Sequence, residues 1–324
     1  MRLFDYQRVT SVDDAVKSSE GAAYLAGGTS LLDLMKLEVL GPAKLVDVGR
    51  LELRKIEVDK DVVRIGALAT NTEVAQHPEV RRRLRAVSEA LLSGASPQLR
   101  NAATVGGNLL QRTRCAYYRD LGTRCNKRRP GSGCDAMEGW TRMHAVLGTS
   151  DQCIAAHPSD FCVALAALDA TVHVKGPAGE RDIPFNDLHL LPGDHPEREF
   201  SLQAGELIAS VSVPSTQLAA RSRYVKVRDR ASYAFALASC AAGLELSGGV
   251  IKSGRIALGG VGTKPWRAPA AEALLVNQRP ENGLFNRAAE EALRGAVAHG
   301  DNGFKIELAK RVIVRALTLA AEGA

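Results

Sequence analysis

The sequence predicts an α+β fold in two parts, and three observations support this. The chain has 324 residues, is 45% hydrophobic, and is long for a single domain. Its first part mixes short strand-like and helix-like segments, whereas the part after residue 220 places strand-like runs before helix-like ones. A change of character between Pro214 and Arg221 predicts domains over residues 1–220 and 221–324.

The first part alternates strands and helices. Paired glycines at positions 27 and 28 separate a strand from a helix expected over residues 31–37. Apolar residues at intervals of four, three and four predict one helix over residues 80–91, with a solvated arginine face. A second Gly-rich turn is expected over residues 104–109. Strands are expected at residues 23–26, 44–48, 62–67 and 171–174.

The second part predicts a sheet followed by helices. Strands are expected at residues 224–227, 234–246 and 256–261, with Gly-rich turns between them. Three helices follow. The last is amphipathic through Ile306, Ala309, Val312, Ile313, Ala316 and Leu317.

Composition narrows the class of protein only slightly. A formal net charge of +6 and a pI near 9.0 suit an acidic protein partner, a phosphate-bearing ligand or nucleic acid, without choosing among them. No apolar stretch approaches the roughly 20 residues of a membrane span, and the first residues do not resemble a signal peptide. We therefore expect neither a membrane partner nor export directed by this chain.

Two glycine pairs are the first candidates for a binding site. Residues 26–30 read Ala-Gly-Gly-Thr-Ser, and residues 104–109 read Thr-Val-Gly-Gly-Asn-Leu. Glycine pairs before a helix let backbone N–H groups approach a ligand closely, which suits a diphosphate. Neither loop matches the Rossmann or P-loop pattern. Two such loops raise the odds of a dinucleotide, but their spacing does not show that they meet.

Four of the six cysteines fall in one irregular, basic segment at about residues 111–155. They are separated by nine, eight and eighteen residues: Cys115, Cys125, Cys134 and Cys153. Four thiolates suit zinc or an iron–sulfur cluster, although no C-x2-C pair is present. The alternative is scattered free cysteines. The same segment contains the cationic residues Arg112, Arg114, Arg119, Arg124, Lys127, Arg128 and Arg129. They favour an anionic cluster or, alternatively, a solvated or nucleic-acid-binding loop.

The remaining reactive residues predict no further site. Cys162 and Cys240 lie in apolar runs and are expected to be buried small hydrophobes. His144, His157 and His173 show no ligand spacing. No Ser/His/Asp arrangement or carboxylate pair stands out, so no catalytic residue is expected on this chain.

Taken in order, these motifs resemble the FAD-binding medium subunit of the xanthine dehydrogenase, or molybdenum hydroxylase, family. The matching series comprises both glycine loops, Arg100-Asn101, residues 157–160 (His-Pro-Ser-Asp), residues 205–208 (Gly-Glu-Leu-Ile) and Lys226. The resemblance implies a two-lobed FAD-binding domain of the vanillyl-alcohol-oxidase/CO-dehydrogenase flavoprotein type over residues 1–220. A smaller α+β domain, like the CO-dehydrogenase flavoprotein C-terminal domain, would follow over residues 221–324.

The cysteine-bearing insertion narrows the resemblance. It is similar to the iron–sulfur-containing flavin subunit of periplasmic aldehyde oxidoreductases and, more distantly, to that of hydroxybenzoyl-CoA reductase. This implies a 4Fe–4S cluster with the ligands Cys115, Cys125, Cys134 and Cys153.

The resemblance also assigns the FAD contacts. It places the diphosphate on Leu25, Ala26, Gly27, Gly28, Thr29, Ser30 and Leu31. It places the other parts of the cofactor on Thr104, Gly107, Asn108, Asp160, Ile208 and Lys226. Tyr117 or Tyr118 is expected to cover the flavin face.

The function implied is that of an FAD and 4Fe–4S electron-transfer subunit in a heterotrimeric molybdenum hydroxylase, an aldehyde oxidoreductase. A large subunit with a molybdenum cofactor would oxidise the substrate. Electrons would pass through 2Fe–2S clusters on a small subunit to the FAD and on to an external acceptor. Residues 124–129 are expected to dock an acidic carrier such as ferredoxin.

Three alternatives remain open from the sequence. One is the flavin subunit of a hydroxybenzoyl-CoA reductase-like enzyme, and another is a scaffold subunit that has lost FAD. The third is a zinc-stapled nucleic-acid-binding protein. The location is expected to be periplasmic, by co-export with a partner that bears a twin-arginine signal, or cytoplasmic.

Overall fold

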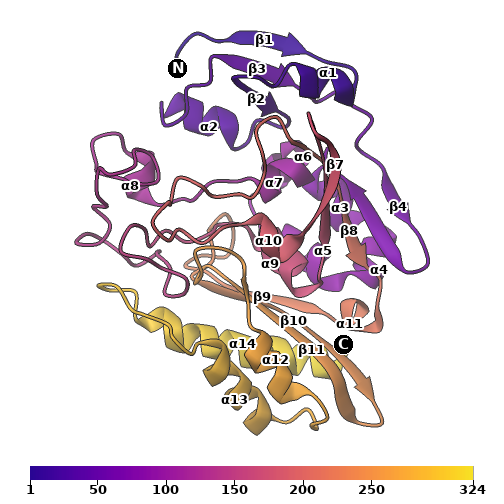
Figure 1. The fold of residues 1–324 in the computed structure, drawn as a ribbon. Coiled ribbons are helices and arrows are strands. Elements are labelled where there is room, and N and C mark those ends of the chain that lie inside the picture. The colour runs from indigo at the N-terminus through magenta and orange to yellow at the C-terminus, as the bar shows by residue number, and fades with distance from the viewer. Residues whose placement is uncertain (324) are drawn as a thin grey trace.

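The computed structural model describes residues 1–323 and contains three sheets, which follow one another from the top to the base of Figure 1. The first sheet is parallel, with the order β1-β3-β2. Its strands are β1 (Asp5–Arg8), β2 (Ala22–Leu25) and β3 (Lys44–Asp47). Parallel strands need crossover connections, and these contain α1 (Val12–Lys17) and α2 (Leu31–Lys36). The strands predicted at 23–26 and 44–48 and the helix at 31–37 are confirmed to within a residue.

The second sheet is antiparallel and has the order β4-β5-β8-β6-β7. Its strands are β4 (Ile56–Val58), β5 (Val62–Gly66), β6 (Thr171–Gly176), β7 (Gly179–Pro184) and β8 (Leu207–Pro214). The strands predicted at 62–67 and 171–174 are confirmed. The central strand β8 was not predicted. Most of its residues are buried on both faces, so the alternation that marks a half-exposed strand is missing.

Short helices surround this second sheet. They are α3 (Asn71–Gln76), α4 (Pro78–Arg83), α5 (Arg85–Ser93), α6 (Pro97–Ala102), α7 (Val105–Leu109), α9 (Asp160–Ala167) and α10 (Phe185–Leu188). Apolar residues of α5, α7 and α9 share one core with β5, β6 and β8. The site residues described below are carried by the ends of these elements.

The prediction of one helix over residues 80–91 is wrong, because the helix breaks at Leu84. This residue has φ −131° and ψ 55°, outside the helical region, and separates α4 from α5. Its side chain is nonetheless fully buried, as are those of Val80 and Val87. The break lets both short helices place their apolar residues in the same core. The predicted apolar spacing was therefore right, whereas the prediction of one continuous helix was not.

The third sheet is antiparallel, with the order β12-β11-β10-β9. It comprises β9 (Arg223–Val227), β10 (Ala238–Ser247), β11 (Val250–Gly259) and β12 (Trp266–Arg267), and α11 (Gln217–Ala220) precedes it. The three predicted helices are present as α12 (Pro269–Leu275), α13 (Asn282–Ala292) and α14 (Phe304–Glu322). The predicted strand at 234–246 begins later than expected, and β11 begins before residue 256.

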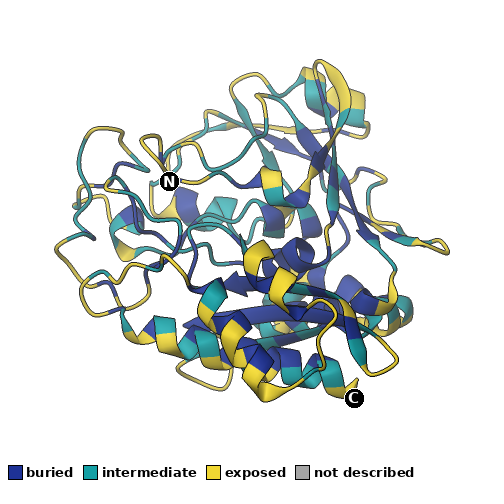
Figure 2. Cartoon of the chain, turned by 60° about the horizontal axis from the view of Figure 1, so that its bottom comes forward, coloured by how far each residue is buried: buried dark blue, intermediate teal, exposed yellow. Residues whose placement is uncertain are grey.

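Strand β10 is covered on both faces. Ala238, Cys240 and Ala242 pack in the core that contains α14, whereas Ala241 packs in the core that contains α9. Successive residues of a strand face opposite sides, so this division follows from the pleat. Cys240 is fully buried, as predicted for a small hydrophobe. Figure 2 shows these strands in dark blue beside helices whose outer faces are yellow.

The segment at residues 111–155 is largely irregular, as predicted. Within the described chain it contains one helix, α8 (Ala116–Arg119), and two isolated β-bridges between its own residues, Cys125–Cys134 and Ser150–Cys153; Leu147 forms a third bridge, with Gly262. In Figure 1 its loops project beside α8, between the N-terminal sheet and the C-terminal helices. None of the helices within residues 1–323 is long and apolar enough to cross a membrane.

Candidate functional site

The two glycine loops lie against each other. Gly28 has a φ of +74°, a backbone angle that favours glycine. A Cβ added at Gly27 would lie 1.8 Å from the carbonyl oxygen of Ala102, just before the second loop. The structure therefore brings together two segments that sequence spacing alone could not connect.

The second loop is a short helix and not the tight turn that was predicted. Thr104 caps α7, and its Oγ1 accepts a hydrogen bond from the backbone N–H of Gly107 at 3.3 Å. The N–H of Gly106 donates to the carbonyl of Ala67, and a Cβ added at Gly106 would lie 3.9 Å from Cβ of Ile208. The loop is thus fixed between the end of β5 and the start of β8.

A buried polar group joins the other predicted FAD residues. The carboxylate of Asp160 accepts hydrogen bonds from Nζ of Lys226 at 2.7 Å and from the hydroxyl of Tyr224 at 2.5 Å. Burial raises the pKa of Tyr224 well above its usual value, so the hydroxyl stays protonated and donates. The hydroxyl of Ser159 donates to Oδ1 of Asn108 at 2.7 Å. Tyr224 was missed from the sequence, where only its neighbour Lys226 matched a motif.

The contact between the loops gives a first prediction. Gly27→Ala is expected to force the loops apart and to weaken FAD binding about tenfold or more, since overpacking typically costs about 1–3 kcal/mol. The measurement is the flavin content of the purified protein, together with the Kd from titration of FAD into the apoprotein. Gly283→Ala is the matched control, because a Cβ there would meet its nearest atom only at 3.9 Å. Equal affinities in the two variants would contradict the expectation.

The four clustered cysteines line one cavity of about 280 Å³. They come from widely spaced parts of the irregular segment, and all are free thiols: Cys115, Cys125, Cys134 and Cys153. Cys125 and Cys153 are buried, and the other two are partly exposed. Cys162 and Cys240 are buried elsewhere in the chain. The four cysteines are therefore grouped in space and not scattered.

These thiols lie in a poorly solvated place. Burial raises the pKa of Cys115 to about 12 and raises the pKa values of Cys134 and Cys153, and the neighbouring sulfurs raise them further. Four thiolates in such a place would need a compensating cation, which a metal centre could supply. The backbone N–H of Ala155 donates to Sγ of Cys153 at 3.5 Å, as expected for a sulfur placed to carry negative charge.

The spacing of the sulfurs bears on the kind of metal. Within residues 1–323, the side-chain ligand atoms of His157, Cys162 and His189 lie within 4.8 Å of one another. No three sulfurs of the four clustered cysteines come that close. A tetrahedral zinc ion with Zn–S bonds of about 2.3 Å requires sulfurs only about 3.8 Å apart. As they stand in this structure, the four sulfurs are therefore not drawn together around a single ion.

Charged side chains flank this cavity. Lys127 pairs with Glu199 at 3.0 Å, and Arg112 forms an ion pair with the same carboxylate. Arg124 pairs with Asp135. Arg128 donates to the backbone carbonyls of Tyr117 and Tyr118 at 2.8 Å. Most cations of the insertion are thus engaged within the chain, which corrects the picture of a freely solvated basic loop.

Two of these arginines connect the cysteine segment to the first glycine loop. Arg114 and Arg119 pair with Asp33, which lies on α2 just after that loop, at 3.0 and 2.7 Å. Burial alone would raise the pKa of Asp33, but the two guanidinium groups hold it below its usual value. The two predicted cofactor regions therefore share a network of charges.

His144 is a site residue that its sequence spacing did not reveal. Its Nε2 lies 3.1 Å from Sγ of Cys115, and its side chain is buried. Burial lowers its pKa to about 4, so the ring is neutral near pH 7. Its backbone carbonyl accepts hydrogen bonds from Asn302 and from Lys305, at the start of α14. The C-terminal domain thereby holds the end of the cysteine segment.

Lys305 provides a prediction about pH. It is fully buried, and burial lowers its pKa to about 7. Between about pH 7 and the usual lysine pKa near 10.4 the unfolded chain binds a proton that the folded chain does not. Stability should therefore rise with pH across that window, by roughly 1 kcal/mol per pH unit from this group. Chemical unfolding of the wild type and Lys305→Met from pH 6 to 9 tests this; parallel curves would contradict it.

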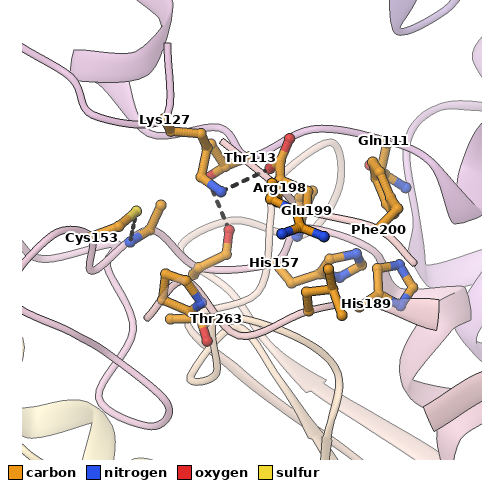
Figure 3. A pocket seen from close by; sticks show the side chains of 15 residues that line it. Gln111, Thr113, Lys127, Cys153, His157, His189, Arg198, Glu199, Phe200 and Thr263 are labelled. Carbon is orange, nitrogen blue, oxygen red and sulfur yellow. Dashed lines mark hydrogen bonds and ion pairs between the residues drawn. The ribbon is translucent and has the colours of Figure 1, made fainter. Parts of the chain in front are cut away.

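A second cavity of about 440 Å³ adjoins the first and shares Lys127, Cys153 and Ala155 with it. Figure 3 shows Lys127 directed toward Glu199, with His157 and His189 at the other end. The side-chain nitrogen and sulfur atoms of His157, Cys162 and His189 that could bind a metal lie close together at this end.

The histidine end of this cavity does not suit a metal ion. Nδ1 of His157 accepts from the backbone N–H of Ser159 at 3.3 Å, which leaves the ring proton on Nε2. Nε2 of His189 donates to the carbonyl of Leu109. Burial lowers the pKa of both rings, that of His189 to about 4. With Nε2 of His157 protonated, the three side chains do not offer a lone pair each to a metal ion, so their approach is a packing contact.

Tyr117 and Tyr118 both line the cysteine cavity. Tyr118 is almost fully buried beneath Arg112, whose guanidinium carbon lies 5.3 Å from the ring centroid. The hydroxyl of Tyr117 accepts from the backbone N–H of Trp140. Both tyrosines therefore lie at the cysteine cavity, and a role at the flavin face stays a prediction.

Known proteins resemble the chain over its full length. Residues 2–216 match a family described as the FAD binding domain in molybdopterin dehydrogenase, and residues 223–320 match the CO dehydrogenase flavoprotein C-terminal domain. The chain is 50% identical to the aldehyde oxidoreductase FAD-binding subunit PaoB of Escherichia coli, over 99% of each chain. It is 27% identical to the carbon monoxide dehydrogenase medium chain of Hydrogenophaga pseudoflava, over 98% and 96%. A structure of the carbon monoxide dehydrogenase from that organism superposes with a TM-score of 0.78 at 28% identity, covering 100% of this chain and 99% of the other.

Proposed function

Because this chain belongs to the FAD-binding medium subunits of the molybdenum hydroxylase family, we propose that it is the FAD and 4Fe–4S electron-transfer subunit of a heterotrimeric aldehyde oxidoreductase. As a member of that family it is an oxidoreductase subunit. The observation that carries the cluster is the convergence of Cys115, Cys125, Cys134 and Cys153 on one cavity.

The FAD would lie where the two glycine loops meet. Backbone N–H groups of residues 25–31 would bind the diphosphate. Gly27 lets this loop pack against the backbone of Ala102, and Gly28 takes the positive φ that its turn requires. Thr104, Gly107 and Asn108 would hold the other side. Asp160 and Lys226 neutralise each other and so offer a polar, fixed wall without a net charge.

The cluster would lie between the four sulfurs. Lys127 and Arg112 stand beside the cavity and would offset part of the negative charge of four thiolates, although Glu199 weakens their effect. Backbone N–H groups at Ala136 and Met137 face Cys134 and would support its sulfur in the same way.

The cofactors supply redox chemistry when bound: FAD accepts electrons singly or in pairs, and the cluster carries one at a time. The chain's own residues hold both groups in a fixed relation. The network of Asp33, Arg114 and Arg119 ties the helix behind the first glycine loop to the cysteine segment.

Its partners would be a large molybdenum-cofactor subunit and a small 2Fe–2S subunit, and no nucleic acid is expected. The external acceptor would be ferredoxin or another carrier. Within residues 124–129, Arg124, Lys127 and Arg128 have internal partners, which leaves Arg129 as the cation best placed to meet one. The complex would be periplasmic, by co-export with a partner, or cytoplasmic.

Two alternatives from the sequence fit less well. A zinc-stapled nucleic-acid-binding protein does not fit this family. A scaffold without FAD does not explain why the loops and the Asp160–Lys226 pair are all retained. The flavin subunit of a hydroxybenzoyl-CoA reductase-like enzyme remains the second candidate, favoured by the cysteine-bearing insertion.

The test is analysis of the complex after anaerobic purification from its native host. We expect one FAD per copy of this chain and about four iron atoms beyond those of the partner's 2Fe–2S clusters. An EPR signal from a reduced cubane cluster should appear at liquid-helium temperature. Absence of flavin would refute the FAD role, and zinc in place of the extra iron would refute the cluster. Turnover of aldehydes, compared with aromatic acyl-CoA thioesters, separates the two enzyme candidates.

A further inference from the structure

One histidine approaches the candidate cluster site from the side of the C-terminal domain. Nε2 of His144 lies 3.1 Å from Sγ of Cys115. Cys115 also faces the backbone N–H groups of Tyr117 and Tyr118, at the start of α8. His144 adds a side-chain contact to a sulfur that already has backbone donors.

The position of His144 is fixed independently of the cysteine. The backbone N–H of His144 donates to the carbonyl of Thr141 at 2.7 Å, and the backbone carbonyl of His144 accepts from Nζ of Lys305 at 2.8 Å. Asn302 and Lys305 are both fully buried. On one side the ring of Tyr117 lies 6.1 Å away between centroids, tilted by 39°. The imidazole is therefore held in place before any metal binds.

The two ring nitrogens of His144 have unequal surroundings. Within residues 1–323, Nδ1 is buried and has no hydrogen-bond partner, while Nε2 faces the sulfur. A thiolate that ligates a metal has no proton to donate. A contact of 3.1 Å between Nε2 and such a thiolate is then favourable when Nε2 carries the proton. An unpartnered Nδ1 is costly, so the arrangement needs a reason to persist.

We propose that His144 is a positioning residue that donates a hydrogen bond from Nε2 to the Cys115 thiolate and thereby raises the reduction potential of the cluster. This inference rests on the proposed function, since it presupposes the cluster. A hydrogen bond to a ligating sulfur withdraws negative charge and favours the reduced state, which carries one more electron. Because the ring is held by the C-terminal domain, this bond does not require reorganisation when the electron arrives.

The test compares His144→Leu, His144→Gln and wild type in the complete, natively purified complex. In His144→Leu we expect the equilibrium constant for one-electron reduction of the cluster to fall about tenfold, which is 59 mV for such a couple. The amide of His144→Gln keeps an N–H donor and should restore at least half of the shift. The FAD potential should not change. His195→Leu, at an exposed histidine on a surface loop, is the control for loss of an imidazole.

Potentials are read from an anaerobic redox titration followed by EPR, with iron counted in each variant. Pulsed EPR of wild type grown with ¹⁵N-histidine should show coupling of the reduced cluster to one histidine nitrogen. That measurement decides the matter even if His144→Leu assembles no cluster.

An iron-replete His144→Leu protein with an unchanged potential would overturn the inference, as would a Gln variant shifted as far as the Leu variant. Absence of the nitrogen coupling would do the same. These results would leave the proposed function intact, whereas a wild-type complex without the extra iron would contradict both the proposed function and the role of His144.

Discussion

A complex that carries Cys125→Ala is expected to lose about four iron atoms and to keep its FAD. Cys125 is buried in the wall of the cysteine cavity and pairs with Cys134 in a β-bridge, so alanine removes one thiolate from the set of four that faces the cavity. A cubane cluster needs its thiolates, and the irregular segment has little hydrophobic core to order it without metal. The measurements are iron and flavin per complex and the rate of trypsin cleavage in the segment, which should rise several-fold.

The matched control for this variant is Cys240→Ala. Cys240 is also fully buried, but it lies in β10 away from the cavity. It should keep all of its iron and flavin and lose only the small stability of a buried sulfur. If both variants lose iron equally, or if neither does, the cysteine cavity is not the cluster site.

Lys226→Met is expected to cost the protein about 3–5 kcal/mol of stability, because it leaves the carboxylate of Asp160 buried without its cation. The side chains of Lys226 and Asp160 are only 3% and 9% exposed, so water cannot replace the lost charge. Nζ of Lys226 also donates to the carbonyl of Ser93, and that bond is lost too. We further expect the flavin content to fall by at least tenfold. Unfolding in denaturant and the flavin-to-protein ratio are the two measurements.

A double variant separates the structural role of this pair from its role at the cofactor. Asp160→Asn with Lys226→Met removes both charges, so it should recover part of the stability while flavin binding stays weak. Lys310→Met is the control, since Lys310 forms an exposed pair with Glu307 on α14 and should change neither quantity appreciably. Recovery of full flavin binding in the double variant would show that the pair serves folding alone.

Much of the architecture was predictable because it follows from local periodicity. The strand and helix on either side of Gly27 and the strand at residues 62–67 were all found in place. The break at Leu84 and the helical form of residues 105–109 were not predicted, since each depends on contacts made elsewhere in the chain. The motif series led to the correct family, whereas the pairing of strands came only from the structure.

The candidate site was predictable in its residue types and not in its connections. Cysteine clustering is visible in the sequence, because the four residues fall within one segment that lacks periodicity. The neighbours that complete the site are far away in the chain. His144 lies 29 residues from Cys115, and Tyr224 lies 64 residues from Asp160. No spacing pattern in the sequence predicts such pairs, because tertiary contacts form between residues at irregular separations along the chain.

The hydrogen bonds from Asn302 and Lys305 to the carbonyl of His144 have a consequence for how the protein is made. A ribosome synthesises the cysteine segment well before it reaches residue 305, so the newborn segment lacks the lysine and asparagine that fasten it. The hydrogen bonds that hold the carbonyl of His144 can therefore form only when synthesis of the chain is almost complete.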